Sequence, residues 1–324
     1  MAIRSTSDTI YFMTNQTHSV QIVEIGSRNH EQRLDNFLLS QLKGVPKSRV
    51  YKLLRSGQVR VNKGRKQASY RLQSGDMVRI PPVRMPEKSD SDIPDFLLEK
   101  IRQSIIFEDD DLLVMNKPAG LAVHSGSNIA FGVIEILRQA RPDDEMLELV
   151  HRLDRDTSGC LLIAKSRTAL NQLHALFRDD HAMEKIYRAI VAGRWRGGER
   201  LVEAPLLKNT LQGGERMVMV DNEGKSAKSL FQPVDYFPGA TLMDVQLFTG
   251  RTHQIRVHAT HEHHPIAGDP KYGDKTFNQA LKKAGFKRMY LHAYRLAFKL
   301  ANTSYNVTAP LDDEWAQLIQ HLKS

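Results

Sequence analysis

One short segment of the sequence, HRLDRDTSG at residues 151–159, concentrates charged side chains that could act on a substrate. Two carboxylates and two guanidiniums fall within five positions: Arg152, Asp154, Arg155 and Asp156. Neighbouring positive charge keeps a carboxylate ionised, and an ionised carboxylate can serve as a nucleophile or a base. The apolar run GCLLIAK follows and predicts a buried strand that would hold the segment rigidly. Asp154 is therefore the candidate catalytic residue, although a surface turn of ion pairs accounts for the segment equally well.

A second polar segment, TGRTHQIRVH at residues 249–258, follows a run with strand character. A turn at Gly250 and the alternation after it predict a strand with these side chains on one face: Thr252, Gln254, Arg256 and His258. Core strands rarely carry so many polar groups without a ligand or a partner charge. Arg251, at the turn, is placed to reach a carboxylate.

A third segment, EKIYRAIVAG at residues 184–193, predicts a strand on which Tyr187 shares a face with Ala189 and Val191. A lone tyrosine on a strand is usually part of the core. In an RNA enzyme, however, an aromatic ring can stack on an extruded base, which contributes roughly 1–3 kcal/mol per base. The residues alone leave both interpretations open.

The sequence lacks the motifs that several other kinds of chemistry require. It contains no phosphate-binding G-x-x-x-x-G-K-[ST] loop, no G-x-G-x-x-G fingerprint, no G-x-S-x-G elbow and no pair of cysteines. The single cysteine, Cys160, is expected to be a small buried hydrophobe. A group of irregularly spaced histidines is expected to lie in a loop that faces solvent or RNA rather than to bind metal: His258, His261, His263 and His264. We therefore expect no nucleotide cofactor, no other cofactor and no metal.

Positive charge is concentrated near the start of the chain. The 324 residues carry a formal charge of +9. Residues 31–84 contain thirteen Lys or Arg and three acids, a balance of +10, so the rest of the chain is close to neutral. A small, strongly basic module of this kind is typical of a surface that binds a polyanion, although a solvated basic surface without a partner has the same composition.

The apolar pattern divides the chain into segments. We expect a mobile N-terminus at 1–30, a basic module at 31–84, an extended Pro-rich linker at 85–103 and a larger catalytic domain at 104–324. Apolar runs in 104–324 predict strands interrupted by helices near 131–140, 166–177 and 312–322, hence an α+β fold with a mixed or antiparallel sheet.

The basic module is predicted to hold two amphipathic helices and a small sheet. The first helix covers Leu34 to Leu42 and ends at Gly44; the second begins near Pro46 and ends at Gly57. Apolar Val50, Leu53 and Leu54 form one side of the second helix, and cations fill its other positions: Lys47, Arg49, Lys52 and Arg55. Short strands are expected around 59–61 and 78–80.

Nothing in the sequence predicts a membrane protein or an exported one. No stretch approaches the roughly 20 apolar residues of a membrane helix, and the first thirty residues lack the pattern of a secretory signal. We expect a cytoplasmic protein.

Six motifs together resemble the RluA-type family of pseudouridine synthases, and they follow the order found in that family. They are NKPAGLAVH, HRLDRDTSG, EKIYRAIVAG, TGRTHQIRVH, HPIAGDPKYG and a late LHA, covering most of residues 104–300. Residues 33–65 resemble the S4 RNA-binding domain that precedes the catalytic domain in members acting on ribosomal RNA. Many members have proline after the histidine of the first motif, whereas His124 is followed by Ser125 here.

The resemblance implies isomerisation of uridine to pseudouridine in 23S rRNA or a large-subunit precursor, without a cofactor. It makes Asp154 the catalytic aspartate, Arg152 a side chain that helps to extrude the uridine, Tyr187 the ring that stacks on the base, and Arg251 the partner that holds Asp154 ionised. The two basic helices would contact RNA. No surface suggests self-association, so we expect a monomer.

Two other kinds of protein fit part of the pattern. A non-catalytic RNA-binding or ribosome-assembly protein would account for the basic module. A carboxylate hydrolase would account for Asp154, but a nuclease normally gathers several acids around metal and a glycosidase pairs two carboxylates, whereas only Asp156 lies near Asp154 in the sequence.

Overall fold

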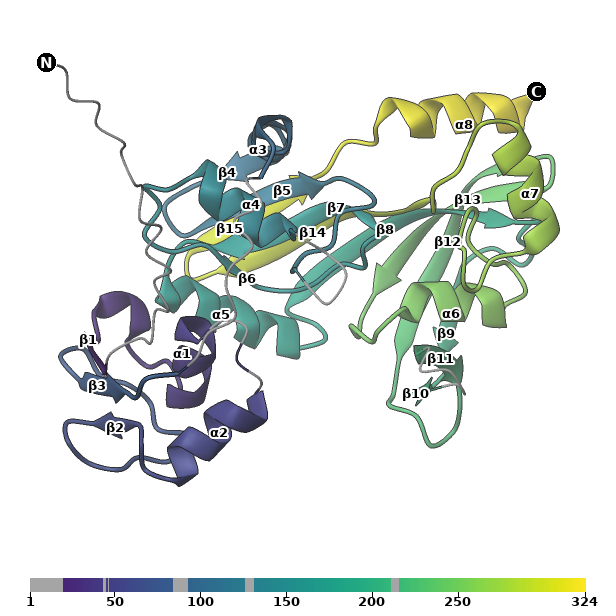
Figure 1. Cartoon of the computed structure of the whole chain (residues 1–324). Helices are drawn as coiled ribbons and strands as arrows, with labels where there is room; N and C mark the ends of the chain where they lie inside the picture. The colour runs from purple at the N-terminus through teal and green to yellow at the C-terminus, as the bar shows by residue number, and fades with distance from the viewer. Residues whose placement is uncertain (1–19, 43–44, 46, 84–92, 126–130, 211–215) are drawn as a thin grey trace, which may run out of the picture. The chain divides into compact units, whose positions relative to one another are not determined.

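The chain divides into two compact units, Met1–Asp90 and Ser91–Ser324, which are described separately. The structure is a computed structural model and describes residues 20–42, 45, 47–83, 93–125, 131–210 and 216–324 (Figure 1). The expected boundary between a basic module and a larger domain thus falls close to the division between these units.

The first unit holds helices and a three-stranded antiparallel sheet. Its elements are β1 (Gln21–Glu24), the 3-10 turn η1 (Ser27–Asn29), α1 (Leu34–Gln41), α2 (Lys47–Arg55), β2 (Arg60–Val61) and β3 (Met77–Ile80). The strand order is β1-β3-β2. The apolar face of α2 is buried, and its cations Lys47, Arg49, Lys52 and Arg55 are exposed. This confirms the two helices and the small sheet; Gly44 and Pro46 lie outside the described residues.

The expectation of a mobile N-terminus is wrong for residues 20–30. β1 pairs with β3 in antiparallel register, with Val23 opposite Val78, and Ile25 is 1% exposed in the core of the unit. Four residues are too short a run for an alternating pattern to stand out. The strand forms because β3 offers a free edge. The first part of that expected segment, residues 1–19, lies outside the described residues.

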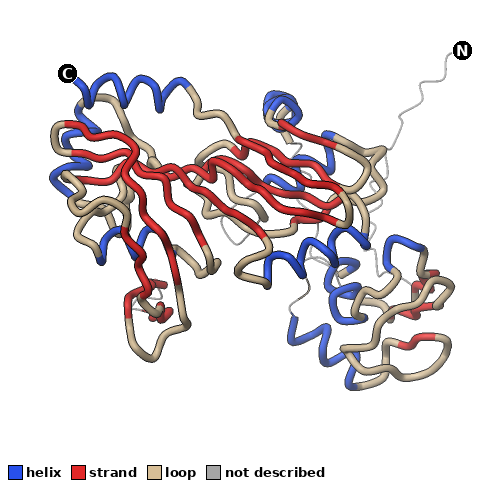
Figure 2. The backbone as a smooth tube through the Cα atoms, turned by 180° about the vertical axis from the view of Figure 1, so that it is seen from behind, coloured by secondary structure: helices blue, strands red, loops and turns tan. Residues whose placement is uncertain are grey.

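The second unit is built on a ten-stranded sheet, with a separate two-stranded hairpin. The large sheet runs in the order β4-β5-β7-β14-β8-β13-β12-β9, with β15 pairing β14 and β6 pairing β7, and extends through the whole unit (Figure 2). Its strands are β4 (Ile105–Glu108), β5 (Leu112–Lys117), β6 (Glu148–Leu149), β7 (Ser158–Ala164), β8 (Met183–Ala192), β9 (Arg200–Glu203), β12 (Lys228–Phe237), β13 (Ala240–Leu247), β14 (Leu291–Leu300) and β15 (Thr303–Thr308). The hairpin is β10 (Leu206–Thr210) and β11 (Arg216–Val220). β7 and β14 pair in parallel and the other described pairs are antiparallel, which confirms the α+β fold with a mixed sheet.

The helices of the second unit cover different parts of this sheet. They are α3 (Asp95–Gln103), α4 (Val133–Ala140), α5 (Arg167–Arg178), α6 (Gln254–His261), α7 (Lys275–Lys283) and α8 (Asp313–Lys323). Residues of α4 and α5 share a core with β5 and β7, α6 packs with β8 and β13, and α7 and α8 share a core with the ends of β8, β12 and β13. Within the described residues, no helix is long and apolar enough to cross a bilayer.

Part of the expected linker is a helix of the second unit. α3 occupies residues 95–103, Ile101 is fully buried, and Arg102 donates to the carbonyl of Ala140 at the end of α4. The prolines and acids of this region suggested an extended chain. Leu97, Leu98 and Ile101 nevertheless have helical spacing, and Pro94 stands just before the helix, where proline is tolerated.

The expected strand at 249–258 is also wrong, because the first half of this segment is a turn and the second half, from Gln254, belongs to α6. Gln254 closes a turn: its Oε1 accepts from the backbone N of Arg251 (3.0 Å) and from Thr249 Oγ1 (2.8 Å). Its Nε2 donates to the carbonyl of Lys228 and to Ser229 Oγ on β12. His253 adopts a left-handed backbone conformation (φ 55°, ψ 19°) at the start of α6. Contacts to a distant strand thus override the local alternation.

The parallel pairing of β7 with β14 requires glycine. His292 lies opposite Ser158, and Ala293 opposite Gly159. Gly159 has φ +105°, and a Cβ there would lie 2.2 Å from the carbonyl oxygen of Ala293. No other residue allows this approach, so the glycine of HRLDRDTSG fixes where the loop before β7 ends. Cys160, next along β7, is fully buried, as expected.

Candidate active site

Asp154 lies in the loop between β6 and β7, on the wall between two adjoining hollows. One is a cleft of about 600 Å³ that also contains His124, Arg155 and Lys271. The other, of about 560 Å³, contains Tyr187, Lys185 and Arg251. Both are lined by a shared set of residues: Arg152, Leu153, Asp154, His253 and Arg256. A carboxylate in this position can reach a group bound in either hollow.

Arg256 of α6 is the ionic partner of Asp154. Its Nη1 donates to Asp154 Oδ2 at 3.1 Å, while Nε and Nη2 bind the two carboxylate oxygens of Asp269 at 2.7 and 2.9 Å. The Asp269 side chain is fully buried and that of Arg256 is 8% exposed. Burial opposes ionisation of Asp269, but the hydrogen bonds and charge of Arg256 outweigh it and lower the pKa of Asp269. Burial likewise opposes the charge of Arg256, whose pKa is nevertheless raised by Asp269 and Asp154.

The expected pairing of Arg251 with Asp154 is wrong. The Arg251 Nε donates to the carbonyl of Ser226 at 3.0 Å, and the residue is exposed on the wall of the Tyr187 hollow. Because the chain turns into α6 at His253, position 256 faces the carboxylate instead of position 251. The guanidinium that holds Asp154 is therefore that of Arg256, for which strand alternation predicted only a polar face shared with Thr252 and His258.

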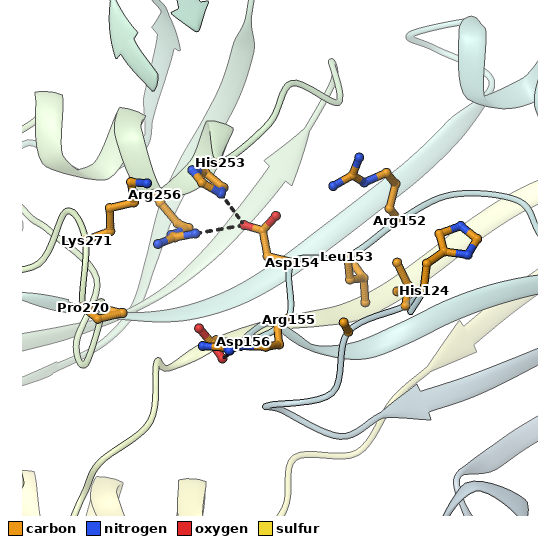
Figure 3. A pocket seen from close by; sticks show the side chains of 12 residues that line it. His124, Arg152, Leu153, Asp154, Arg155, Asp156, His253, Arg256, Pro270 and Lys271 are labelled. Atoms are coloured by element: carbon orange, nitrogen blue, oxygen red, sulfur yellow. Dashed lines mark hydrogen bonds and ion pairs between the residues drawn. The ribbon is translucent and has the colours of Figure 1, made fainter. Parts of the chain in front are cut away.

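Tyr187 and Arg152 do lie beside Asp154. Tyr187, on β8, lines the second hollow, and burial raises its pKa, with the negative charge of Asp154 adding to the effect. Arg152 is exposed and lines both hollows. Figure 3 shows Asp154 with His253 and Arg256 on one side and Arg152 and His124 on the other. The structure thus brings together three of the four residues singled out for the catalytic unit, around one carboxylate.

Lys117 holds the Asp154 loop in place, a role that the sequence analysis did not predict. Its fully buried Nζ donates to three carbonyls, those of Pro118, Leu121 and Arg155, at 2.8, 2.8 and 3.0 Å. Burial lowers the pKa of Lys117 to about 7, against the influence of Asp156 and Asp154. The lysine of NKPAGLAVH therefore ties the turn of that motif to the loop of HRLDRDTSG, which explains why two distant motifs meet.

Two neutral histidines hold the ends of the same loop. His151 Nε2 accepts from the backbone N of Leu162 (3.0 Å), and its ring stacks on Phe177. His292 Nε2 donates to the carbonyl of Ala309 (3.1 Å), so its Nδ1 must accept from Ser158 Oγ (2.8 Å). Burial lowers the pKa of each imidazole to about 4.

We expect His292 to make the protein less stable in acid. Its pKa is about 4 when folded, against an ordinary value of 6.5, so the unfolded chain takes up the proton first as the pH falls. Its contribution to stability is complete above about pH 6.5 and declines toward pH 4, by up to about 1.4 kcal/mol per pH unit. Urea unfolding at pH 7.5, 6 and 5 measures this slope. The variant His292→Asn, which keeps an acceptor for Ser158, should show a shallower slope; equal slopes in the two proteins would contradict this assignment.

The expected exposure of four histidines near residue 260 is wrong for His258 and His264, which are built into the fold, whereas His261 and His263 are exposed. His258 is fully buried in α6, where Nε2 donates to the carbonyl of Ala204 (3.0 Å) and Nδ1 contacts Ser229 Oγ (3.1 Å). His264 Nδ1 donates to the carbonyl of Ala192 (2.8 Å). In the part of the chain that the structure describes, no three His, Cys, Asp or Glu side chains are grouped as a metal site.

Two known families match parts of this chain. The sequence profile of the family described as RNA pseudouridylate synthase matches residues 111–261, and that of the S4 domain matches residues 32–78. The first match spans Asp154, Tyr187 and Arg256; the second contains both helices of the basic unit. Asp269 and Tyr272 lie beyond the matched range.

Alignments with similar proteins cover almost the whole chain. Ribosomal large subunit pseudouridine synthase C of Salmonella typhi is 49% identical over 96% of this chain and 99% of its own length. The protein of the same name from Haemophilus ducreyi is 48% identical over 96% and 99%. Among solved structures, human RNA pseudouridylate synthase domain containing 4 is 25% identical, with a TM-score of 0.60, over 70% of this chain and 96% of that one. These findings favour an enzyme over a non-catalytic RNA-binding protein, and the chain belongs to the RluA-type family of RNA pseudouridine synthases, with an S4 domain before the catalytic domain.

Proposed function

We propose that this enzyme converts specific uridines of 23S ribosomal RNA to pseudouridine, in the large subunit or its precursor, with Asp154 as the catalytic carboxylate. One observation carries the catalytic assignment: the carboxylate of Asp154, 25% exposed, lines both hollows and is held by a nearly buried arginine. The relatives named as ribosomal large subunit synthases, aligned over 96% of the chain, support the choice of RNA.

The reaction requires of the protein one correctly positioned base or nucleophile and little else. The bond from C1′ to N1 of the uracil breaks, the base turns, and a bond from C1′ to C5 forms. N1 gains a proton and C5 loses one, so the product is an isomer and no electrons, phosphoryl groups or other atoms are exchanged. Asp154 can attack C1′, attack C6 of the base, or remove the 2′ proton; each role uses an ionised carboxylate in a site that excludes water.

Tyr187 and Arg152 have the chemistry to hold an extruded uridine. Taking a base out of a helix requires a few kcal/mol, which stacking and charge can offset. Tyr187 presents an aromatic ring in the second hollow, and Arg152 presents an exposed guanidinium to both. We therefore assign Tyr187 to stacking on the uracil and Arg152 to keeping the nucleotide out of its helix.

The S4 unit supplies a second RNA contact through α2. Its four exposed cations, Lys47, Arg49, Lys52 and Arg55, stand on the side opposite a buried stripe of Val50, Leu53 and Leu54. A rigid helix with one cationic side can contact several phosphates at once, and each neutralised phosphate adds to the salt dependence of binding.

Replacing these four cations by glutamine should flatten the salt dependence of RNA binding. For each phosphate that α2 no longer neutralises, the slope of log K against log salt should fall in magnitude by about 0.7 to 0.9. A charge-matched control replaces four exposed lysines of the second unit, Lys275, Lys282, Lys283 and Lys287, by glutamine. Filter binding of 23S rRNA fragments from about 50 to 300 mM KCl measures both slopes. If the α2 variant kept the wild-type slope, or if the control changed as much, α2 would not be the phosphate-binding element.

We also propose that the enzyme works as a monomer in the cytoplasm, where ribosomal RNA is transcribed and assembled. The support for the cytoplasm is the name of the relatives, which gives the ribosomal large subunit as their target. Sedimentation faster than that of a 36.8 kDa particle would reject the monomer.

Tritium release tests the proposed substrate directly. RNA made with 5-[³H]-uridine loses tritium when C5 is joined to the sugar. We expect release from 23S rRNA, naked or assembled, and little from 16S rRNA treated in the same way, with no cofactor added. Release from neither RNA, with binding intact, would reject the function; equal release from both would reject large-subunit specificity alone.

A further inference from the structure

We propose that the two oxygens of Asp154 have different tasks: Oδ2 is held by Arg256 and by the Nε2–H of His253, and Oδ1 is the oxygen that reacts. Tyr272 is the positioning residue that keeps the proton of His253 on Nε2. This inference rests on the assignment of Asp154 as the catalytic carboxylate and adds two residues to that site.

The hydroxyl of Tyr272 has a fixed direction of donation. The backbone N of Val218, on β11, lies 3.0 Å from the hydroxyl oxygen and can only donate to it. The Tyr272 proton is then left to donate, and the acceptor is His253 Nδ1 at 2.9 Å. Burial raises the pKa of Tyr272, so the hydroxyl keeps this proton. The hydrogen bonds therefore run in one direction, from the hairpin through Tyr272 to His253.

His253 can then carry its single proton only on Nε2. Its side chain is 19% exposed and meets the Tyr272 ring edge to face, with centroids 5.5 Å apart. Burial lowers the pKa of His253; Asp154 and Asp269 oppose that effect, and Arg256 and Lys271 add to it. A neutral imidazole that accepts at Nδ1 is a donor at Nε2.

The donor nitrogen of His253 faces one oxygen of Asp154. Nε2 lies 3.7 Å from Oδ2, the same oxygen that accepts from Arg256 Nη1 at 3.1 Å. The 3.7 Å separation is longer than a hydrogen bond and needs only a small closing movement to become one. Figure 3 shows both interactions ending on this one oxygen, with the other oxygen of the carboxylate turned away from Arg256. Oδ2 is thus oriented from two sides, and Oδ1 is left for the substrate.

The backbone at position 253 is held in an uncommon conformation. His253 is one of the non-glycine residues with positive φ, in a conformation that bulky side chains adopt rarely. The hairpin strands β10 and β11 pack on α6 through Leu206, Val218 and Val257, with Tyr272 against the same cluster. Tyr272 and α6 therefore link the hairpin to the geometry at Asp154.

Two substitutions at His253 distinguish the role of the Nε2–H donor from that of the rest of the imidazole ring. Glutamine can place an amide N–H where Nε2 stands. Asparagine, which tolerates the left-handed conformation, can meet Tyr272 but cannot reach Asp154. We expect His253→Asn to lower the single-turnover rate by about tenfold or more, and His253→Gln to stay within about threefold of wild type. The affinity for RNA should change less than about twofold in both. Equal loss in the two variants, or a wild-type rate in His253→Asn, would overturn the role of Nε2–H.

A measurement without turnover tests the tautomer itself. With ¹⁵N-labelled histidine rings, the His253 signals, assigned by their loss in His253→Asn, should show the proton on Nε2 in wild type at pH 7.5. In Tyr272→Phe, which removes the hydroxyl but keeps the ring, they should shift toward a mixture that includes Nδ1–H. A wild-type protein with the proton on Nδ1, or a Tyr272→Phe spectrum identical to wild type, would overturn the role of Tyr272 even if the enzyme were fully active. A wild-type protein without isomerase activity, by contrast, would contradict only the proposed function.

Discussion

Asp154→Asn should abolish isomerisation while leaving RNA binding in place. Asparagine has the same shape and can still accept from Arg256 through its amide oxygen, but it can act neither as a nucleophile nor as a base. We expect the single-turnover rate to fall by at least about 10⁴-fold, the scale seen when a catalytic aspartate is neutralised. Tritium release measures the rate, and filter binding should give a Kd within about threefold of wild type.

Asp156→Asn is the matched control for this experiment. Asp156 is two positions away, lines the same cleft and pairs with Arg155 through Oδ1 at 3.1 Å. Its loss should change the rate by less than about tenfold. A comparable collapse in both variants would indicate a mechanism with two carboxylates, and normal turnover by Asp154→Asn would remove Asp154 from the chemistry altogether.

Asp269→Asn should cause the largest loss of stability among substitutions at the site. Asp269 is fully buried and is the two-pronged acceptor for Arg256, so the asparagine amide would face the guanidinium with one oxygen and one NH2 group, which cannot accept a hydrogen bond. Breaking a buried pair by removing one partner typically destabilises a protein by about 3–5 kcal/mol. Urea unfolding measures the change, and turnover should fall as well because Arg256 is no longer held against Asp154.

The pair of Arg188 with Asp244, in which the carboxylate also accepts two hydrogen bonds from one guanidinium, provides a comparison for Arg256 and Asp269. Asp244 accepts from Arg188 at 2.9 and 3.3 Å, but it is 27% exposed. Asp244→Asn should therefore destabilise by only about 1 kcal/mol. If Asp269→Asn were no more harmful than Asp244→Asn, the buried pair would contribute no more than a partly exposed pair does.

The sequence predicted those parts of the molecule that depend on local pattern. The helices at 34–41 and 47–55 have apolar spacing and end at turn residues. β7 is a long apolar run and β8 ends in a shorter one, AIVA, so the identity of these elements does not depend on distant contacts. Asp154 could be proposed as the catalytic residue because its charged neighbours lie beside it in the chain and the strand that holds it follows directly.

The partners of Asp154 could not be predicted in the same way. Arg256 was recognised as a polar residue needing a ligand, but alternation by two and helical spacing coincide over so short a stretch. The decision between them lies with Gln254, whose amide binds β12 more than twenty residues earlier. Asp269 carries no local sign that it will be buried against Arg256. Its motif, HPIAGDPKYG, was noted only through family resemblance.

The junction between β7 and β14 bears on when the enzyme can become active during synthesis. Ser158 and His292, joined there by a hydrogen bond, are 134 positions apart, and Arg256 and Asp154 are 102 apart. Chains emerge from the ribosome N-terminal end first, at about 5–20 residues per second. The S4 unit, whose strands and helices lie within residues 20–83, can therefore fold seconds before the catalytic site has its components. A nascent chain could thus hold RNA before it can modify it, and the pocket would close around Asp154 only after β14 and the backbone at Ala309 had been released.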